Sequence, residues 1–453
     1  MPKKKIIRTQ TVTETVPERP IENVPIGGVV TMNYDDFCRY VINHRAVPTL
    51  YDGMKDSYRR LLWSAILSYK EGTMSPAVDL VNAVARWHPH SVDGLDGTMS
   101  LFVHSGVFIG EGTFGSVNIA DGEKEPCAAL RYLHISLSPV YNKLLKDLIK
   151  EVPQVESPNG PTEPLYIPLP LPLSCCLKAD VMGLTALKTT IPSFTPKSLY
   201  QAYIHDDPNL LEVNSDINID KANSELHKLW NTGKGKITYY FKATPCKGPD
   251  GRSEGVMFEG DTWKFVPNWK NEKYRKLLED GKIFQMDLTD INGPKVFLGK
   301  VPDARGITVD DVINLAKEIY FTTIPYEIYV TSEESAKPIP LKIWIDVVYK
   351  NYINLLLQVN KKKIARCEFL IKVQETIPTF GSYILSNPKA SKEQIKKDLK
   401  IDDEMLTELL GKTLSTILQT PENSAKLNNL KKELEELKKF DPIKETEEVI
   451  NQM

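Results

Sequence analysis

Apolar residues recur at helical spacing through the first third of the chain. This spacing predicts helices over residues 34–44, 56–69 and 78–86, and a further short helix that ends near His104. Ser75-Pro76 supplies an N-cap residue and a first-turn proline, so the third helix is expected to begin there. Short strands with glycine-rich turns follow. Helices and then a hairpin are the order of elements in a winged helix-turn-helix domain.

Between about Val152 and Pro338, β-branched and aromatic stretches alternate with polar turns. Prolines cluster in residues 164–172, and Gly233 to Tyr240 has the pattern of a turn that enters a strand. The sequence around Gly233 does not match GxxxxGK[ST], so it predicts no phosphate-binding loop of that type. We therefore expect a separate α/β domain over residues 152–338.

The last part of the chain, residues 339–453, returns to helical spacing. Apolar residues recur every three or four positions in two stretches, which contain Ile345, Val348, Tyr352, Leu355 and Val359, and then Leu427, Leu430, Leu434 and Leu437. The two stretches predict an antiparallel coiled coil. A small helical cap is expected between them, over residues 392–399 and 403–418. A plain helical bundle would have the same periodicity.

Length and charge restrict the class of protein. A chain of 453 residues is too long for one core, and about two to four domains are expected. Residues 1–30 are rich in Pro, Thr and Val and lack helical periodicity, which predicts an extended N-terminal arm before a domain at 31–151. The formal charge of −2 means that any nucleic-acid surface must be local. The sequence shows neither a long apolar run nor a signal peptide, so a cytoplasmic location without a membrane partner is expected.

The six cysteines are scattered and show no CxxC spacing. This usage favours reduced thiols and argues against a zinc site or a disulfide framework. The adjacent Cys175 and Cys176 are expected to be an inert, half-buried pair rather than a redox pair.

The most informative chemistry is an arginine directly before a tyrosine, Arg131-Tyr132, downstream of the glycine-rich residues 112–116. A phenol with a pKa near ~10 is a weak nucleophile at neutral pH. A fixed guanidinium can stabilise both the phenolate and the charge that grows on an attacked phosphate. Such dipeptides are common, and a strand residue with its ring in the core is the plain alternative. A run of basic residues upstream of Tyr132 is typical of a phosphate-binding surface, although it can also be a solvated face.

Five segments together resemble type IIA DNA topoisomerases. Residues 45–60 are similar to the family block R-A-L-P-x-x-x-D-G-L-K-P-x-x-R-R, and residues 87–90 to Y-H-P-H. Residues 112–116 are similar to G-N-F-G-S, and residues 128–132 to A-A-x-R-Y. The segment from Gly183 to Pro192 is similar to G-I-A-x-G-x-x-T-x-I-P, one residue shorter. The resemblance covers nearly the whole chain after residue 30, and its size and layout are closest to the medium subunit of T-even-type phage topoisomerases.

The resemblance implies a fold and a set of site residues. The fold would be multidomain α/β, with a CAP-like winged-helix DNA gate, an α/β tower domain, and a coiled coil with an exit-gate cap. Tyr132 would attack a DNA phosphodiester and form a 5′-phosphotyrosyl link, while Arg131 holds the scissile phosphate. Residues near the cut would include Arg45, Lys55, Arg59, Arg60, His88 and His90. For each histidine, a helix-start residue that only orients its neighbours is the alternative. Leu184 lies nearest the family's apolar wedge, which unstacks a base step, and an ordinary core leucine is the alternative there.

The resemblance also implies partners. The acidic ligands for Mg²⁺ in this family lie in a toprim domain with E-G-D-S-A and DxD motifs, and neither motif nor an ATPase signature occurs here. We therefore expect a homodimeric DNA-cleaving subunit of an ATP-dependent enzyme, with Mg²⁺ and ATP handled by separate partner subunits. The host cytoplasm would be its location if it is phage-encoded. A non-catalytic winged-helix DNA-binding dimer is the alternative function.

The chain departs from the family pattern at three places near the site. Leu133-His134 replaces Thr-Glu after the tyrosine, residues 56–58 replace P-x-H, and Ser91-Val92 replaces Gly-Asp. The second change removes one imidazole, because Tyr58 stands where the family has His. These changes leave the reaction type intact but put the acid–base details in doubt.

Overall fold

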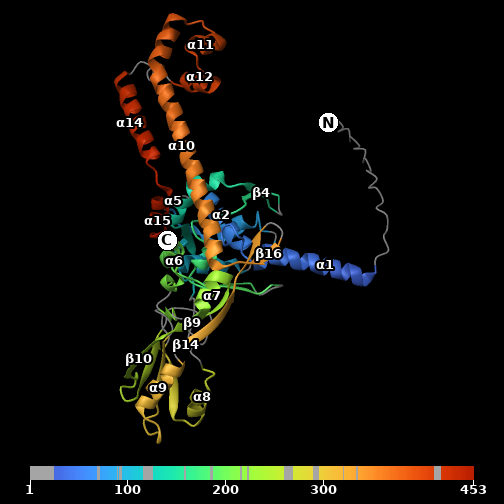
Figure 1. The fold of residues 1–453 in the computed structure, drawn as a ribbon, viewed down its shortest axis with the longest axis vertical. Helices are drawn as coiled ribbons and strands as arrows, with labels where there is room; N and C mark the ends of the chain where they lie inside the picture. Colours follow the sequence, from blue (N-terminus) through green and yellow to red (C-terminus); the bar gives the residue numbers. More distant parts are fainter. Residues whose placement is uncertain are drawn as a thin grey trace, which may run out of the picture.

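A computed structural model describes most of the chain after residue 24. The described residues are 25–68, 72–88, 90, 94–115, 126–157, 160–183, 187–214, 217–221, 224–259, 269–288, 295–319, 321–332, 335–412 and 420–453. The fold is mixed α/β and multidomain, with several separate sheets. A long helical arm and a sheet-containing lobe extend from opposite ends of a central body (Figure 1). None of the helices in the described residues is long and apolar enough to cross a membrane.

The first region contains four helices and a small antiparallel sheet. The helices are α1 (Ile26–Val41), which continues as the π-helical turn η1 (Ile42–Ala46), α2 (Asp56–Ser68), α3 (Ala77–Val84) and α4 (Leu95–His104). The sheet has the order β1-β3-β2, from β1 (Ser75–Pro76), β2 (Phe108–Glu111) and β3 (His134–Leu137). The predicted helices are therefore present, and the first begins at Ile26 rather than at Tyr34.

The prediction that a helix begins at Ser75-Pro76 is wrong. These two residues form strand β1, which pairs with Ile135 and His134 of β3, and the helix starts one residue later at Ala77. Pairing with a strand about sixty residues away outweighs the local preference of this dipeptide for a helix start, and proline is tolerated at a strand terminus.

Helix α1 projects from the body (Figure 1). Its large apolar side chains are exposed to solvent in the single chain: Ile26, Val30, Met32, Tyr34 and Phe37.

The middle region contains two larger sheets and several helices. Its first part comprises α5 (Pro139–Leu148), the pair β4 (Gln154–Glu156) and β5 (Thr162–Pro164), α6 (Pro196–His205) and α7 (Ser224–Thr232). A five-stranded sheet has the order β6-β7-β14-β9-β8, from β6 (Val181–Gly183), β7 (Thr189–Ile191), β8 (Asn218–Ile219), β9 (Lys234–Tyr240) and β14 (Phe321–Glu327). The turn into a strand predicted at Gly233 is confirmed as the start of β9.

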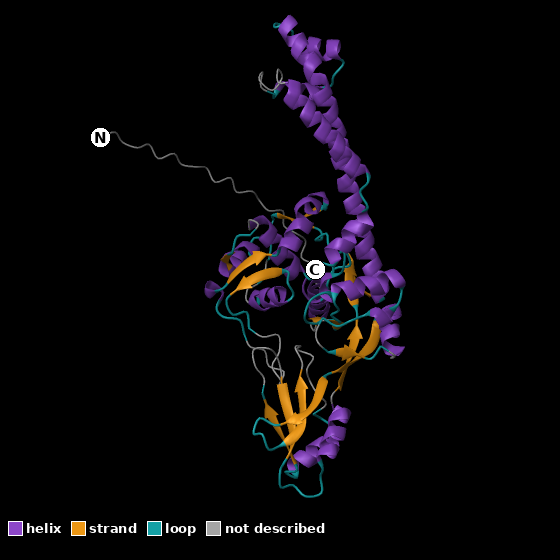
Figure 2. Cartoon of the chain, turned by 90° about the vertical axis from the view of Figure 1, so that its left-hand side faces the viewer, coloured by secondary structure: helices purple, strands orange, loops and turns teal. Residues whose placement is uncertain are grey.

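The second sheet forms the lobe opposite the helical arm (Figure 2). Its order is β10-β11-β13-β12, from β10 (Lys242–Lys247), β11 (Glu254–Glu259), β12 (Ile283–Asp287) and β13 (Lys295–Lys300), with α8 (Glu272–Glu279) and α9 (Val309–Ile319). The hairpin β15 (Tyr329–Ser332) and β16 (Ser335–Pro338) leads into the C-terminal helices. One cluster of buried apolar side chains includes Met54, Leu298 and Tyr352, so the regions on both sides of residues 151 and 338 share a core.

Two long helices run antiparallel in the arm. They are α10 (Leu341–Ser386), which is about 70 Å long at 1.5 Å per residue, and α14 (Thr420–Lys438). Three side chains of α10, spaced seven residues apart, donate hydrogen bonds to α14. Their partners are also seven residues apart and run in the opposite direction. The bonds are Asn360 Nδ2 to Leu437 O (3.1 Å), Cys367 Sγ to Leu430 O (3.3 Å) and Gln374 Nε2 to Asn423 Oδ1 (2.9 Å). Helix α14 therefore pairs with residues 360–374 of α10. The predicted partner stretch is wrong, because its residues Ile345, Val348, Tyr352 and Leu355 are buried in the main core of the molecule.

Short helices cover the tip of the arm. Helix α11 (Lys392–Leu399) coincides with the first predicted segment of the cap, and α12 (Asp403–Leu410) with the start of the second. A small core joins them to α10, with Phe380, Ile395 and Leu409 buried in it. Residues 413–419, which include the end of the second predicted segment, lie outside the described residues. After α14, helix α15 (Pro442–Ile450) returns the chain to the body (Figure 1).

Candidate active site

Tyr132 lies on the surface, at the end of a short 3-10 turn (Leu130–Tyr132) directly before β3. Its side chain is 66% exposed. The guanidinium carbon of Arg131 lies 4.9 Å from the centroid of the tyrosine ring. The alternative that this tyrosine is a core strand residue is therefore wrong: the phenol is accessible and has a cation beside it.

Neighbouring residues fix the turn that presents Tyr132. Leu133 is fully buried and anchors the turn from one side. Gly112 has a φ of +109°, and a Cβ there would lie 2.8 Å from Leu133 Cδ2, so only glycine fits. The amide of Ala128 donates to Thr113 O (2.9 Å), which ties this turn to the glycine-rich segment. Ser116 of that segment lies outside the described residues.

The loop formed by residues 45–53 is held by contacts from the other end of the sequence. Leu50 N donates to Thr331 O (2.9 Å), and Thr331 N donates to Pro48 O (2.9 Å). The indole of Trp344, at the start of α10, donates to Leu50 O (3.0 Å). The loop is thereby attached to β15 and to the base of the long arm.

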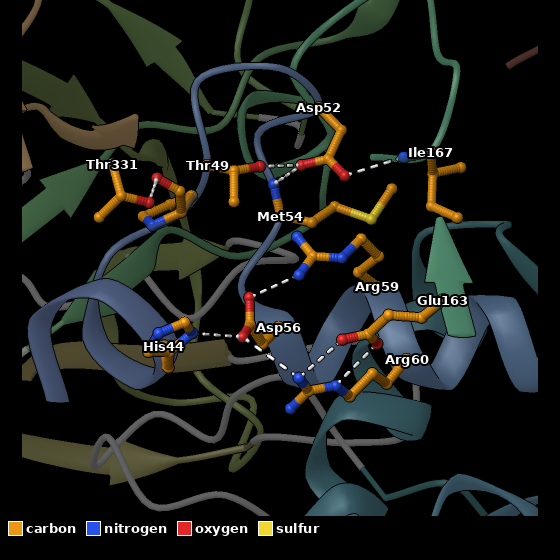
Figure 3. Close-up of polar contacts among 11 residues, drawn as sticks. His44, Thr49, Asp52, Met54, Asp56, Arg59, Arg60, Glu163, Ile167 and Thr331 are labelled. Carbon is orange, nitrogen blue, oxygen red and sulfur yellow. Dashed lines mark hydrogen bonds and ion pairs between the residues drawn. The ribbon is translucent and has the colours of Figure 1, made fainter. Parts of the chain in front are cut away.

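Asp52 and Gly53 fix the end of this loop. The buried carboxylate of Asp52 accepts hydrogen bonds from Met54 N (2.9 Å) and Ile167 N (3.0 Å), as Figure 3 shows. Burial raises the pKa of Asp52, and these hydrogen bonds oppose the rise. Gly53 has a φ of +70°, and a Cβ there would lie 2.7 Å from Pro172 Cβ. The turn formed by Asp52 and Gly53 therefore packs against the proline-rich segment at residues 164–172.

Arg59 and Arg60 lie on α2 and are buried among carboxylates (Figure 3). Arg59 Nη2 donates to Asp56 Oδ1 (2.7 Å). Arg60 donates through Nε and Nη2 to the two carboxylate oxygens of Glu163 on β5, at 2.9 and 2.8 Å. Arg60 therefore joins α2 to β5. Arg59 pairs only within α2, and its Nε and Nη1 are buried without a hydrogen-bond partner among the described residues.

Lys55 contacts the hairpin formed by β6 and β7. Its ammonium donates to Met182 O (2.6 Å), and burial lowers its pKa to about 8. Gly183 packs so closely against the carbonyl of Ala46 that a Cβ would clash. The base of the hairpin is thus held from two sides by the loop that carries Arg45 and Lys55. Leu184, the predicted wedge, lies outside the described residues.

His88 and His90 lie together, with ring centroids 5.0 Å apart. Burial and the nearby Arg60 lower the pKa of His88 to about 4, and its Nδ1 is buried without a hydrogen-bond partner among the described residues. His90 Nε2 lies 2.8 Å from the hydroxyl of Tyr40. Burial, with Arg45 and Arg60 nearby, lowers the pKa of His90 as well. Both imidazoles therefore favour the neutral form at pH 7.

The predicted residues fall into two groups. Arg45, Arg60, His88 and His90 share one electrostatic neighbourhood. Within the described part of the chain, no hydrogen bond, ion pair or ring contact joins that neighbourhood to Arg131-Tyr132. The single chain does not bring the two groups into contact.

Sequence reasoning missed three members of the site, which are His44, Asp56 and Glu163. Asp56 had a sequence signal, because it stands three and four residues before two arginines on a predicted helix. Glu163 had no sequence signal, since its pairing with Arg60 spans 103 positions.

Tyr58 is enclosed, and burial raises its pKa to about 12. Among the described residues, no group of three or more His, Cys, Asp or Glu could hold a metal ion.

Comparison with known proteins gives consistent matches. Residues 45–244 match the family model of the DNA gyrase/topoisomerase IV A subunit. The DNA gyrase A subunit of Brachyspira hyodysenteriae is 24% identical over 298 residues, which are 60% of this chain and 34% of that protein. Its counterpart in Buchnera aphidicola is 27% identical over 290 residues, covering 59% and 34%. The DNA topoisomerase 4 A subunit of Bacillus subtilis is 27% identical over 316 residues, covering 63% and 38%.

The matched part of the chain spans only about a third of the length of these relatives. It nevertheless contains the loop at 45–53, the buried arginines, the histidine pair and Arg131-Tyr132. Residues 45–244 of the chain are therefore similar to the A subunits of DNA gyrase and topoisomerase IV.

Proposed function

We propose that this chain is the DNA-cleaving and rejoining subunit of a type IIA topoisomerase, and that Tyr132 is its nucleophile. The observation that carries the proposal is the exposed phenol of Tyr132 with the Arg131 guanidinium 4.9 Å from its ring, inside the family-matched segment. A tyrosine of the apolar core could not reach a DNA phosphate, whereas this one is open to solvent.

The chemistry is an exchange of phosphodiesters. The phenol loses its proton, its oxygen bonds to phosphorus, and the bond from phosphorus to the 3′-oxygen breaks, which leaves a 5′-phosphotyrosyl link and a free 3′-hydroxyl. Attack by that hydroxyl reverses each step, so one strand break is stored and resealed without net hydrolysis. In a homodimer each subunit would make one such break, so both strands are cut, and a second duplex would pass through while the two breaks are held open. The guanidinium of Arg131 would hold the phosphate oxygens as charge builds on them.

The finer architecture supports the same proposal. We assign residues 31–151 as a winged-helix, CAP-like DNA gate, because three helices lead into the sheet β1-β3-β2 beside Tyr132. Residues 152–338 would be the tower domain, and residues 1–30 an N-terminal arm. The antiparallel contacts at seven-residue intervals between α10 and α14 support a coiled coil within residues 339–453. Its capped tip would be the exit gate of a homodimer.

DNA contacts near the cut would come from exposed or partly exposed cations. Arg45 and Arg131 are exposed, and Lys55 contacts β6, the strand that precedes Leu184 in the sequence. Leu184 remains the proposed wedge between base steps. We propose that His88 and His90 line this site. Arg59 and Arg60 are buried next to it and would stabilise its structure.

The active holoenzyme would need further subunits. Among the described residues of this chain, no cluster of His, Cys, Asp or Glu could hold a metal ion. We propose that a partner toprim domain holds Mg²⁺ and that a partner ATPase uses ATP, in the cytoplasm of the cell. The gyrase and topoisomerase 4 names of the relatives support this division of labour.

The decisive experiment traps the covalent intermediate. The chain is mixed with its partner subunits, Mg²⁺ and labelled duplex DNA, and the reaction is stopped with denaturant. Wild-type protein should yield labelled protein–DNA adduct, and Tyr132→Phe should yield none. The matched control is Tyr34→Phe, which removes an equally exposed hydroxyl from α1 and should leave the adduct unchanged.

If the wild-type chain binds DNA but forms no adduct with its partners, the alternative of a non-catalytic DNA-binding dimer replaces the enzyme. Cleavage by the isolated chain with Mg²⁺ alone would instead overturn the assignment of the metal ligands to a partner.

A further inference from the structure

His44 is an imidazole of the site that neither the motifs nor the comparisons single out. It lies on η1, directly before the exposed Arg45, and its side chain is 47% exposed. Its Nδ1 lies 3.1 Å from Asp56 Oδ2, whose carboxylate is only 5% exposed (Figure 3). Its ring also lies 5.1 Å from the ring of Tyr40. His44 is thus half in solvent and half in contact with a buried acid.

Asp56 is well suited to hold this imidazole. Burial opposes its charge, but Arg59, the hydrogen bond from His44, and Arg60 together lower its pKa to about 2. The carboxylate is therefore ionised at every pH at which the protein would work. An ionised carboxylate on Nδ1 requires a proton on that nitrogen, fixes the ring orientation and stabilises an imidazolium. The other ring nitrogen, Nε2, has no partner among the described residues.

The other two imidazoles differ in this respect. His88 has a buried, unpartnered Nδ1, and the Nε2 of His90 is engaged by the hydroxyl of Tyr40. Neither has a carboxylate within hydrogen-bond distance in the described part of the chain. His44 is the histidine of this neighbourhood that combines exposure, a carboxylate partner and an exposed arginine next to it.

We propose that His44 is an additional DNA-phosphate contact whose Nε2–H donates to a phosphate oxygen when the ring is protonated, and that Asp56 is its positioning residue. The inference rests on the proposed function, since it takes duplex DNA to be the ligand of this surface. It assigns the phosphate contact to His44 and Arg45, in front of the buried Arg59 and Arg60.

Several charged groups lie around His44. Asp56 Oδ2 lies 3.1 Å from His44 Nδ1 and 3.6 Å from Arg60 Nη2, and Arg45 directly follows His44 on η1. Tyr40 on α1 contributes its ring, and its hydroxyl links to His90. Glu156 lies on the same cavity, which has a volume of about 450 Å³ and also includes Ser332. A bound phosphate would add a further negative charge beside the imidazole.

The test measures duplex DNA affinity of the full-length chain at several salt concentrations, between about pH 5.5 and pH 7. This window lies below the titration of Lys55. Wild-type affinity should be about fivefold higher at the acid end, because only an imidazolium can donate from Nε2 while Nδ1–H faces Asp56. His44→Gln should abolish most of that difference. At the acid end, the slope of log K against log [salt] should become shallower by about one in this variant.

Two further variants separate charge from structure. His44→Lys carries a permanent charge and should bind as tightly at the neutral end as wild type does at the acid end. The matched control, His227→Gln on α7, removes a partly exposed histidine whose partner is Asn209, and should keep the wild-type pH dependence.

The outcomes distinguish this inference from the proposed function. If His44→Gln binds DNA with the wild-type pH dependence and salt slope, His44 is not a phosphate contact, and the nucleophile assignment stands. If wild type binds no duplex at either pH, both proposals fail. Failure of His44→Lys to restore affinity in a folded protein would also overturn the role of charge.

Discussion

The two arginine-containing parts of the site differ in what surrounds the guanidinium groups. Arg59 and Arg60 are almost completely buried and paired with Asp56 and Glu163. Arg131 is exposed and lies against the ring of Tyr132. Both belong to segments that resemble family motifs near the DNA cut. A buried guanidinium with two carboxylates can hold elements together, whereas an exposed one can receive a new anion.

The contrast changes how a basic motif is interpreted. The electrostatic attraction of DNA depends on charges that remain uncompensated at the surface, and a buried ion pair contributes little to it. In residues 45–60, Arg45 is exposed and Lys55 half-buried, while the two final arginines support the framework. The motif therefore contains cations that can reach DNA as well as buried arginines that stabilise the fold.

The largest expected effect follows from breaking the buried pair. Arg60→Ala removes a bidentate partner and leaves Glu163 buried and unpaired, which should cost roughly 3–5 kcal/mol of unfolding free energy. Denaturant unfolding monitored by circular dichroism measures this loss. The double variant Arg60→Met with Glu163→Leu should recover much of the stability, because no buried charge is left uncompensated.

The control for this variant is an exposed ion pair. Lys150 lies 4.0 Å from Asp147 with both side chains more than half exposed, and Lys150→Ala should cost under about 1 kcal/mol. Equal losses for Arg60→Ala and Lys150→Ala would show that Arg60 does not support the fold as described.

The exposed member of the comparison should behave in the opposite way. Arg131→Gln should leave unfolding free energy within about 0.5 kcal/mol of wild type, because the side chain is solvent-exposed. Adduct formation with the partner subunits should fall about 10²–10³-fold, because charge on the attacked phosphate loses its nearest donor. Rates of adduct formation measure this effect. Arg86→Gln, also exposed and on the turn after α3, is the matched control and should retain adduct formation. An Arg131→Gln protein that cleaves at the wild-type rate would remove Arg131 from the site.

Much of the fold could be predicted from periodicity, because long amphipathic helices specify themselves locally. The two long helices of the arm and the first cap helix lie where the apolar spacing predicted helices. The spacing did not predict their pairing, because α14 lies against residues 360–374 of α10 and not against the stretch that begins at Ile345. The prediction of a helix start at Ser75-Pro76 was wrong for the opposite reason, because pairing with β3 decides the conformation of these two residues. Strand pairing between distant segments leaves little trace in a single sequence.

The chemistry of the site was only partly predictable. The motifs locate Tyr132 and Arg131, but their exposure depends on the burial of Leu133 and the close approach of Gly112. The burial of Arg60 depends on Glu163, which is 103 positions away and belongs to no motif. The sequence therefore predicts which residue types gather near the site, and the tertiary packing decides which of them face DNA.

Lys55 is half-buried, so it lies between the exposed Arg131 and the buried arginines, and its substitution should have the smallest effect on DNA affinity. Its pKa of about 8 lies below the ordinary lysine value of about 10.4, so it loses its charge between pH 7 and pH 9. Wild-type DNA affinity should fall roughly fivefold across that range, and Lys55→Arg should remove most of the fall.

The stability of the fold should change with pH in the opposite direction. Between about pH 8 and 10 the unfolded chain binds more protons than the folded one, so Lys55 contributes a rise in unfolding free energy with pH. DNA titrations and denaturant unfolding on both proteins measure the two slopes. If affinity in wild type and Lys55→Arg falls equally, Lys55 only supports the Met182 hairpin and belongs with the buried arginines.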